Sequence, residues 1–117
     1  PIKNLAVSLY RQGKYEEAEP LLRESLHILE NAFPGGHWML ASVQSGLGGC
    51  LTSLKKYPEA ERLLLRANDY FNGEPMHDKK YLREAQQGLV GLYEAWGKPL
   101  QAEKYRRLLG PPQAGSN

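Results

Sequence analysis

The chain has 117 residues, of which 41% are hydrophobic and 24% are charged, so its length and composition are typical of one globular domain. Its formal net charge is +2 and its basic residues are interleaved with glutamates, which argues against binding to nucleic acid or to a membrane surface. No apolar run approaches the roughly 20 residues of a membrane span, and a single cysteine excludes an internal disulfide, so a reducing, cytoplasmic location is expected.

The first predicted elements are two amphipathic helices. Apolar residues three and four positions apart predict a helix over residues 2–12. Its residues that are expected to face the following helix are Leu5, Ala6 and Leu9. Gly13 breaks the pattern, and Tyr15 opens a second helix with glutamates in its first turns, where the helix dipole favours negative charge. Pro34 ends this helix at about residue 33.

Two further pairs of helices follow. The same periodicity predicts helices over residues 40–54 and 57–71, after which Asn-Gly-Glu-Pro at residues 72–75 predicts a loop. Apolar positions then predict a helix over residues 82–96. The last helix is expected to begin near a proline and to stop at a glycine, over residues 99–110.

The three pairs repeat one another at a constant spacing of 42 residues. Three sets of residues show this register without a gap: Ala18, Ala60 and Ala102; Leu5, Leu47 and Leu89; Glu19, Glu61 and Glu103. Such self-similarity is typical of a solenoid, in which each unit buries its apolar face by stacking on its neighbours. The sequence therefore predicts an all-α stack of helix pairs.

The residues of the first pair resemble the tetratricopeptide repeat signature. In the stretch LAVSLYRQGKYEEAEPLLRESL, residues 5–26, small residues and turn residues stand at the positions where the tetratricopeptide signature has them. These residues are Ala6, Gly13, Tyr15, Ala18 and Ser25. The 42-residue spacing and the wording LYRQGKYEEAEPL are similar to the kinesin light chain type of this repeat.

The resemblance covers residues 2–109. It implies a right-handed α-solenoid of about three tetratricopeptide helix pairs over residues 1–110, with units of about 1–35, 36–74 and 75–110. Residues 111–117 carry no apolar pattern and are expected to be a disordered tail. The third unit departs from the signature, because Pro99 replaces the turn tyrosine, Arg106 a core leucine and Val90 a small residue. These departures fit a terminal unit that faces solvent.

No catalytic, cofactor-binding or metal-binding residues are predicted. The glycine-rich run Gly46–Gly49 follows no strand and lacks the lysine of a phosphate-binding loop, and apolar periodicity continues through it as in a helix. The three histidines show no ligand spacing, and Cys50 has no second cysteine near it. The protein is therefore not expected to be an enzyme.

A surface remains as the candidate site. In tetratricopeptide proteins the first helices of the pairs line a concave groove that usually holds a peptide. Helical geometry and the 42-residue register turn these residues toward it: Lys3, Asn4, Val7, Tyr10, Arg11, Ser45, Gly46, Gly49, Thr52, Ser53, Gln87, Gly88, Gly91, Glu94 and Ala95. Gly46 and Gly49 have no packing role in this interpretation, so they either leave room for a partner's backbone or belong to a solvated face.

The leading hypothesis is a non-enzymatic interaction module that binds a protein or peptide in this groove. The terminal helices are also expected to allow self-association, since stacking is how such units bury apolar surface. A regulatory or sensor region of a larger protein is the alternative, because the ending LYEAWGKP resembles repeat tails of bacterial serine/threonine kinases. A structural spacer is a third possibility.

Overall fold

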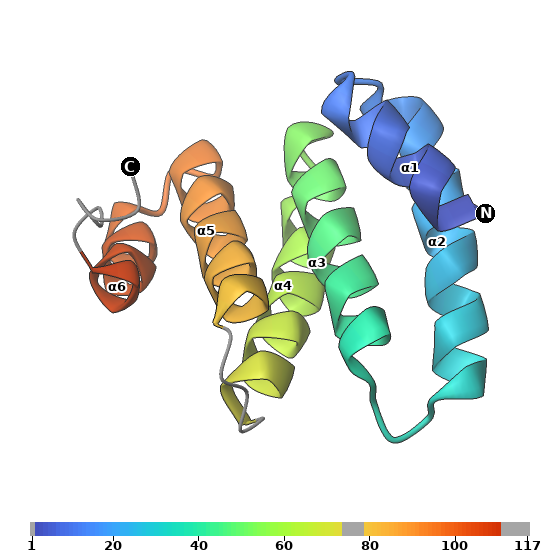
Figure 1. The fold of residues 1–117 in the computed structure, drawn as a ribbon. Coiled ribbons are helices and arrows are strands. Elements are labelled where there is room, and N and C mark those ends of the chain that lie inside the picture. The colour runs from blue at the N-terminus through green and yellow to red at the C-terminus, as the bar shows by residue number, and fades with distance from the viewer. Residues whose placement is uncertain (1, 74–78, 111–117) are drawn as a thin grey trace.

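The computed structural model describes residues 2–73 and 79–110, which form six helices and no strand. The helices are α1 (Ile2–Arg11), α2 (Tyr15–Ala32), α3 (Trp38–Ser53), α4 (Tyr57–Gly73), α5 (Lys80–Ala95) and α6 (Pro99–Leu109). Each helix packs on the next one along the chain, and α3 also packs on α5 (Figure 1). The predicted all-α solenoid of helix pairs is confirmed.

The structure differs from the predicted loop over residues 72–75 and does not describe the predicted tail. Asn72 and Gly73 belong to α4 rather than to the predicted loop, because the buried ring of Phe71 holds the last turn of the helix against the core. A helix also tolerates glycine at its carboxyl end. The other loop residues, Glu74 and Pro75, and the predicted disordered tail over residues 111–117 lie outside the described residues.

The turn inside each pair has the same backbone structure. Gly13, Lys55 and Gly97 occupy one repeat position, and all three have positive φ angles of 79°, 64° and 75°. The amide of the following lysine donates to a carbonyl five residues earlier, at 2.8–2.9 Å in all three turns. This is the Schellman end of a helix, which favours glycine at the position of positive φ. Lys55 therefore adopts a conformation that is costly for a residue with a Cβ atom.

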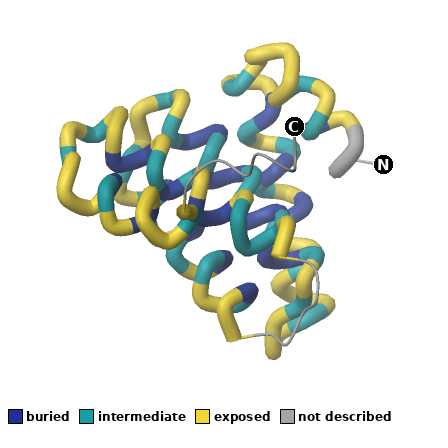
Figure 2. Tube along the Cα trace, turned by 60° about the vertical axis from the view of Figure 1, so that its left-hand side comes forward, coloured by how far each residue is buried: buried dark blue, intermediate teal, exposed yellow. Residues whose placement is uncertain are grey.

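The core runs through the stack from pair to pair (Figure 2). The middle helix α3 is covered on both sides, so Leu47 and Leu51 are fully buried. Leu5 occupies the same repeat position as Leu47, yet it is 54% exposed. That Leu5 faces α2 stays a prediction. Beside it, Ala6 is buried and Leu9 packs against the core, as predicted.

Glycines allow neighbouring pairs to share a side chain. A Cβ atom at Gly48 of α3 would lie 2.5 Å from Cγ of Leu64, and one at Gly88 of α5 would lie 2.8 Å from Cδ2 of the same leucine. The repeat-equivalent leucine, Leu22, lies close to Gly46 in the same way, with 3.9 Å between its Cδ2 and an added Cβ. Leu64 thus packs against a glycine of its own pair and a glycine of the next pair.

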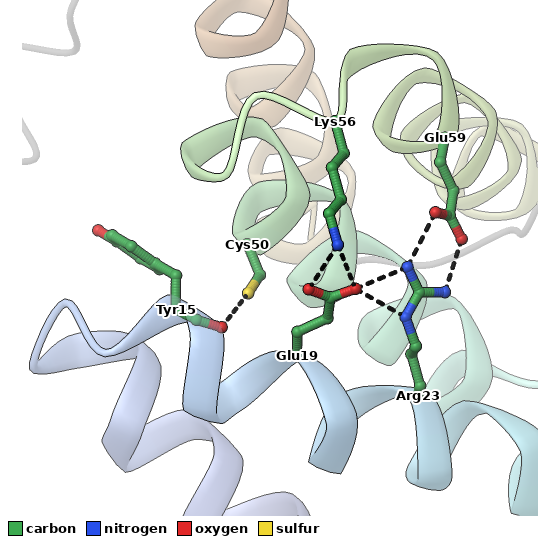
Figure 3. Close-up of polar contacts among 6 residues, drawn as sticks. All are labelled: Tyr15, Glu19, Arg23, Cys50, Lys56 and Glu59. Carbon is green, nitrogen blue, oxygen red and sulfur yellow. Dashed lines mark hydrogen bonds and ion pairs between the residues drawn. The ribbon is translucent and has the colours of Figure 1, made fainter.

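A polar network ties the first pair to the second (Figure 3). Arg23 of α2 donates to both carboxylate oxygens of Glu59 at 2.7 and 2.8 Å, and to Glu19 at 2.9 Å. Lys56 donates to Glu19 at 3.0 Å. The hydrogen bonds from Arg23 lower the pKa of Glu59. Burial acts to raise the pKa of Glu19, but the hydrogen bonds from Lys56 and Arg23 outweigh it and lower the pKa.

Candidate functional site

A hollow of about 650 Å³ opens on the side of the stack formed by α1, α3 and α5. These three helices run in the same direction, because the chain reverses between each helix and the next (Figure 1). The residues that line the hollow are Val7, Tyr10, Arg11, Ser42, Ser45, Gly46, Gly49, Thr52, Ser53, Glu84, Gln87, Gly88 and Gly91. We call this hollow the groove.

Most of the residues that the repeat register predicted for this side of the stack line the groove, from Val7 to Gly91. The binding role of these residues stays a prediction. The side chains of Lys3 and Asn4 lie outside the described ones. Glu94 does not line the groove, because its carboxylate pairs with Arg106 of α6. Ala95 is exposed beyond the groove.

Ser42 and Glu84 line the groove but are missing from the predicted set. They share one repeat position, one helical turn before Ser45 and Gln87. The prediction started from Lys3, and the corresponding position in the first pair would precede the first residue of the sequence. Extending the helical face of the second and third pairs by one turn would have found both residues.

Tyr10 gives Gly49 a packing role that the sequence did not indicate. A Cβ atom at Gly49 would lie 2.8 Å from the hydroxyl oxygen of Tyr10, whose ring packs edge-on against Tyr15 with 5.3 Å between centroids. Burial is the main cause of a raised pKa for Tyr10. The interpretation that Gly49 has no packing role therefore needs correction, whereas a Cβ at Gly46 would make only an ordinary contact with Leu22, at 3.9 Å. By contrast, a Cβ at Gly91 would have no atom within 4 Å.

The groove is uncharged in its middle and oppositely charged at its ends. Serine, threonine, glycine and glutamine line the middle. The hydroxyl of Thr52 donates a hydrogen bond to the carbonyl of Gly48 at 2.9 Å. Arg11 lies at the end where α1 finishes, and Glu84 lies at the end where α5 begins. Neither side chain forms an ion pair with another described residue.

Neither a metal-binding cluster nor a reactive thiol is found among the described residues. No three histidine, cysteine, aspartate or glutamate side chains within residues 2–73 and 79–110 lie close enough together to hold a metal ion. Cys50 is buried, its thiol donates to the carbonyl of Tyr15 at 3.1 Å, and burial raises its pKa to about 11. Such a thiol stays protonated at neutral pH and is a poor nucleophile. None of the described helices is both long and apolar enough to cross a membrane.

Comparison with known proteins identifies a family and a relative. A model of the family described as "Tetratricopeptide repeat" matches residues 2–69. The "Tetratricopeptide repeat protein 19 homolog, mitochondrial" of Drosophila melanogaster is 31% identical over 100 residues, which cover 86% of this chain and 27% of that protein. The chain thus spans about a quarter of the length of this curated relative.

Proposed function

The chain belongs to the tetratricopeptide repeat family, and we propose that it is a non-enzymatic module that binds a segment of another protein in the groove. Repeats of this family generally mediate protein–protein interactions. The observation that carries the proposal is the groove itself, whose floor is formed by glycines of α3 and α5. At Gly91, where an added Cβ would have no atom within 4 Å, bare backbone lets a bound chain approach α5 closely.

The shape and chemistry of the groove indicate what kind of segment fits. From Ser42 to Ser53, α3 extends for about 16 Å at 1.5 Å per residue, enough for roughly five extended residues or three turns of a helix. Hydroxyl and amide groups in the middle favour uncharged side chains and main-chain hydrogen bonds. Arg11 and Glu84 favour an acidic residue at one end of the segment and a basic residue at the other.

We also infer that the repeats are of the 42-residue kinesin light chain-like type, with units of about 1–35, 36–74 and 75–110. Two observations support this inference. The turns at residues 13, 55 and 97 share one backbone structure at the same spacing. Leu22 and Leu64, also 42 residues apart, pack against glycines of the following pair in the same way.

A second candidate is a regulatory repeat region within a larger protein, such as a bacterial serine/threonine kinase. It is supported by the short part of the Drosophila relative that the chain matches, about a quarter. In that case the groove would hold a segment of the same polypeptide. Peptides from other proteins would then compete with that segment, and adding the remainder of the larger protein would weaken their binding.

The groove proposal is tested by filling the groove without disturbing the fold. Gly91→Gln places a side chain in the groove at a position with no atom within 4 Å. Gly73→Gln is the matched control, because Gly73 also lies in a helix with no atom within 4 Å but outside the groove. Twelve-residue peptides selected from a phage-displayed library on the parent should bind the control equally.

The same peptides should bind Gly91→Gln at least about tenfold more weakly, a loss of about 1.4 kcal/mol in calorimetric titration. Far-ultraviolet circular dichroism should show the same helix content for all three proteins. Equal binding to Gly91→Gln and to the parent would show that the segment does not lie in the groove.

A further inference from the structure

The outer face of α6 carries apolar side chains that the fold does not use. Leu100 is 84% exposed and Leu108 is 59% exposed, the highest values among the large apolar side chains of the described residues. They lie eight positions apart, which places them two turns from each other on one side of the helix. Lys104 lies between them, and the neighbouring Arg107 is 80% exposed although its Nε lies 3.5 Å from Oε1 of Glu103. We call Leu100, Lys104, Arg107 and Leu108 the α6 face.

The repeat register shows that this face departs from its counterparts. Leu108 aligns with Glu24 of α2 and Arg66 of α4, so the corresponding surface of the other two pairs is charged at this position. The side of α6 on which a following pair would stack is also charged. There Arg106 replaces the leucine of the other pairs and forms ion pairs with Glu94 and Glu103. The exposed leucines of α6 are therefore not explained by stacking.

The outer face of α2 has the complementary chemistry. Glu16, Pro20, Glu24 and Ile28 follow one another at intervals of four and are all exposed, Ile28 by 52%. Within the described part of the chain, Glu16 and Glu24 form no ion pair. We call these four residues the α2 face. It is acidic with apolar side chains, whereas the α6 face is basic with apolar side chains.

We propose that the α6 face of one copy of this protein docks on the α2 face of a second copy. Lys104 and Arg107 pair with the carboxylates of the α2 face, while Leu100 and Leu108 pack against Pro20 and Ile28. The contact joins two different surfaces, so a pair of copies keeps one free α2 face and one free α6 face for further copies. The groove lies on α1, α3 and α5, so this association leaves it open.

The contact is weak and sensitive to salt. Two helix faces bury much less than the roughly 1,600 Å² of a typical stable interface. The charged pairs lie at the surface, where 0.15 M salt screens them over about 8 Å. Sedimentation equilibrium at low ionic strength should therefore show an average mass that rises above the monomer with concentration. Adding about 1 M sodium chloride should lower it.

Charge reversal makes the test specific. One variant carries Lys104→Glu and Arg107→Glu, and a second carries Glu16→Lys and Glu24→Lys. Each variant alone presents faces of like charge and should remain monomeric where the parent associates. An equimolar mixture presents one acidic α6 face to one basic α2 face, and one basic α6 face to one acidic α2 face, so association should return.

A variant with Arg62→Glu and Arg66→Glu is the matched control, because it reverses two exposed charges that lie four residues apart on α4. It should associate like the parent, and circular dichroism should confirm that all variants fold. A monomeric parent at low salt, charge-reversed variants that associate alone, or a mixture that stays monomeric would each overturn the proposal.

Discussion

Lys55 is the residue at which the chain departs most clearly from its own repeat. It has a φ angle of 64° at a position where the other two turns use glycine. A left-handed conformation costs a residue with a Cβ atom about 1–2 kcal/mol, although glycine also makes the unfolded chain more flexible. We expect Lys55→Gly to raise the free energy of unfolding by roughly 0.5–1 kcal/mol in urea titration.

The reciprocal change provides the control for this prediction. Gly97→Lys introduces the same strain at the equivalent turn, where Gly97 has a φ of 75°. It should lower the free energy of unfolding by about the same amount. If both variants were less stable than the parent, the side chain of Lys55 would have a stabilising role that outweighs the strain.

Gly48 and Gly91 are both helical glycines, yet they should respond to alanine in opposite ways. A Cβ at Gly48 would lie 2.5 Å from Cγ of Leu64, an inner atom of a fully buried side chain that cannot easily move aside. Overpacking of this kind costs about 1–3 kcal/mol. A Cβ at Gly91 meets nothing, so Gly91→Ala should gain about 1 kcal/mol from helix propensity.

Thermal unfolding of the two alanine variants checks this pair of predictions. Gly48→Ala should melt at a lower temperature than the parent, and Gly91→Ala at a higher one. If Gly48→Ala melted higher, α3 and α4 would have to be farther apart at Leu64 than in the structure.

At the scale of elements, Arg23 joins α2 to α4 through Glu59, and this contact makes stability depend on pH. The hydrogen bonds from Arg23 hold the pKa of Glu59 below its ordinary value of 4.5. A lowered pKa in the folded state means that the stabilisation is present above pH 4.5 and is lost as the pH falls through the folded-state pKa. The side chains of Arg23 and Glu59 are 39% and 32% exposed, so solvent screens the pair.

We expect Glu59→Gln to lower the free energy of unfolding by about 0.5–1 kcal/mol at pH 7, and by less at pH 3. Urea titrations at the two pH values measure the difference. Glu17→Gln is the control, because Glu17 is exposed on α2 and forms no ion pair within the described residues. An equal loss at both pH values would mean that Glu59 stabilises the protein by packing rather than by charge.

The helices themselves were predictable from sequence, because period and turn residues are local signals. The exposure of Leu5 was not predictable from sequence. Leu5 and Leu47 occupy the same repeat position, and what differs is whether a preceding helix pair covers them, which local sequence does not encode. The continuation of α4 through Gly73 likewise depends on the burial of Phe71.

The groove was predictable in outline for the same reason. Repeat register and helical geometry selected the side of α3 and α5 on which the hollow lies, while the binding role of that side stays a prediction. Contacts between helices could not be predicted from the repeat register. Tyr10 aligns with Thr52 and Glu94, and neither residue indicates that the hydroxyl of Tyr10 lies next to Gly49. Glu94 was misplaced because its ion pair with Arg106 joins two helices of one pair.

For the whole molecule, the two sides of the stack have separate roles in these proposals. The first helices of the pairs line the groove, and the second helices carry the charged outer faces. The outer charge changes from acidic on α2 to basic on α4 and α6, as Glu24, Arg66 and Lys104 illustrate. A bound segment and a second copy could therefore occupy one molecule at the same time.

The position of Leu64 between Gly48 and Gly88 has a consequence for how this sequence can change over time. A larger residue at either glycine requires a smaller one at position 64, although the two glycines lie 40 residues apart in the chain. Neighbouring repeats therefore cannot diverge independently at these positions, and a substitution in one restricts what the next can accept.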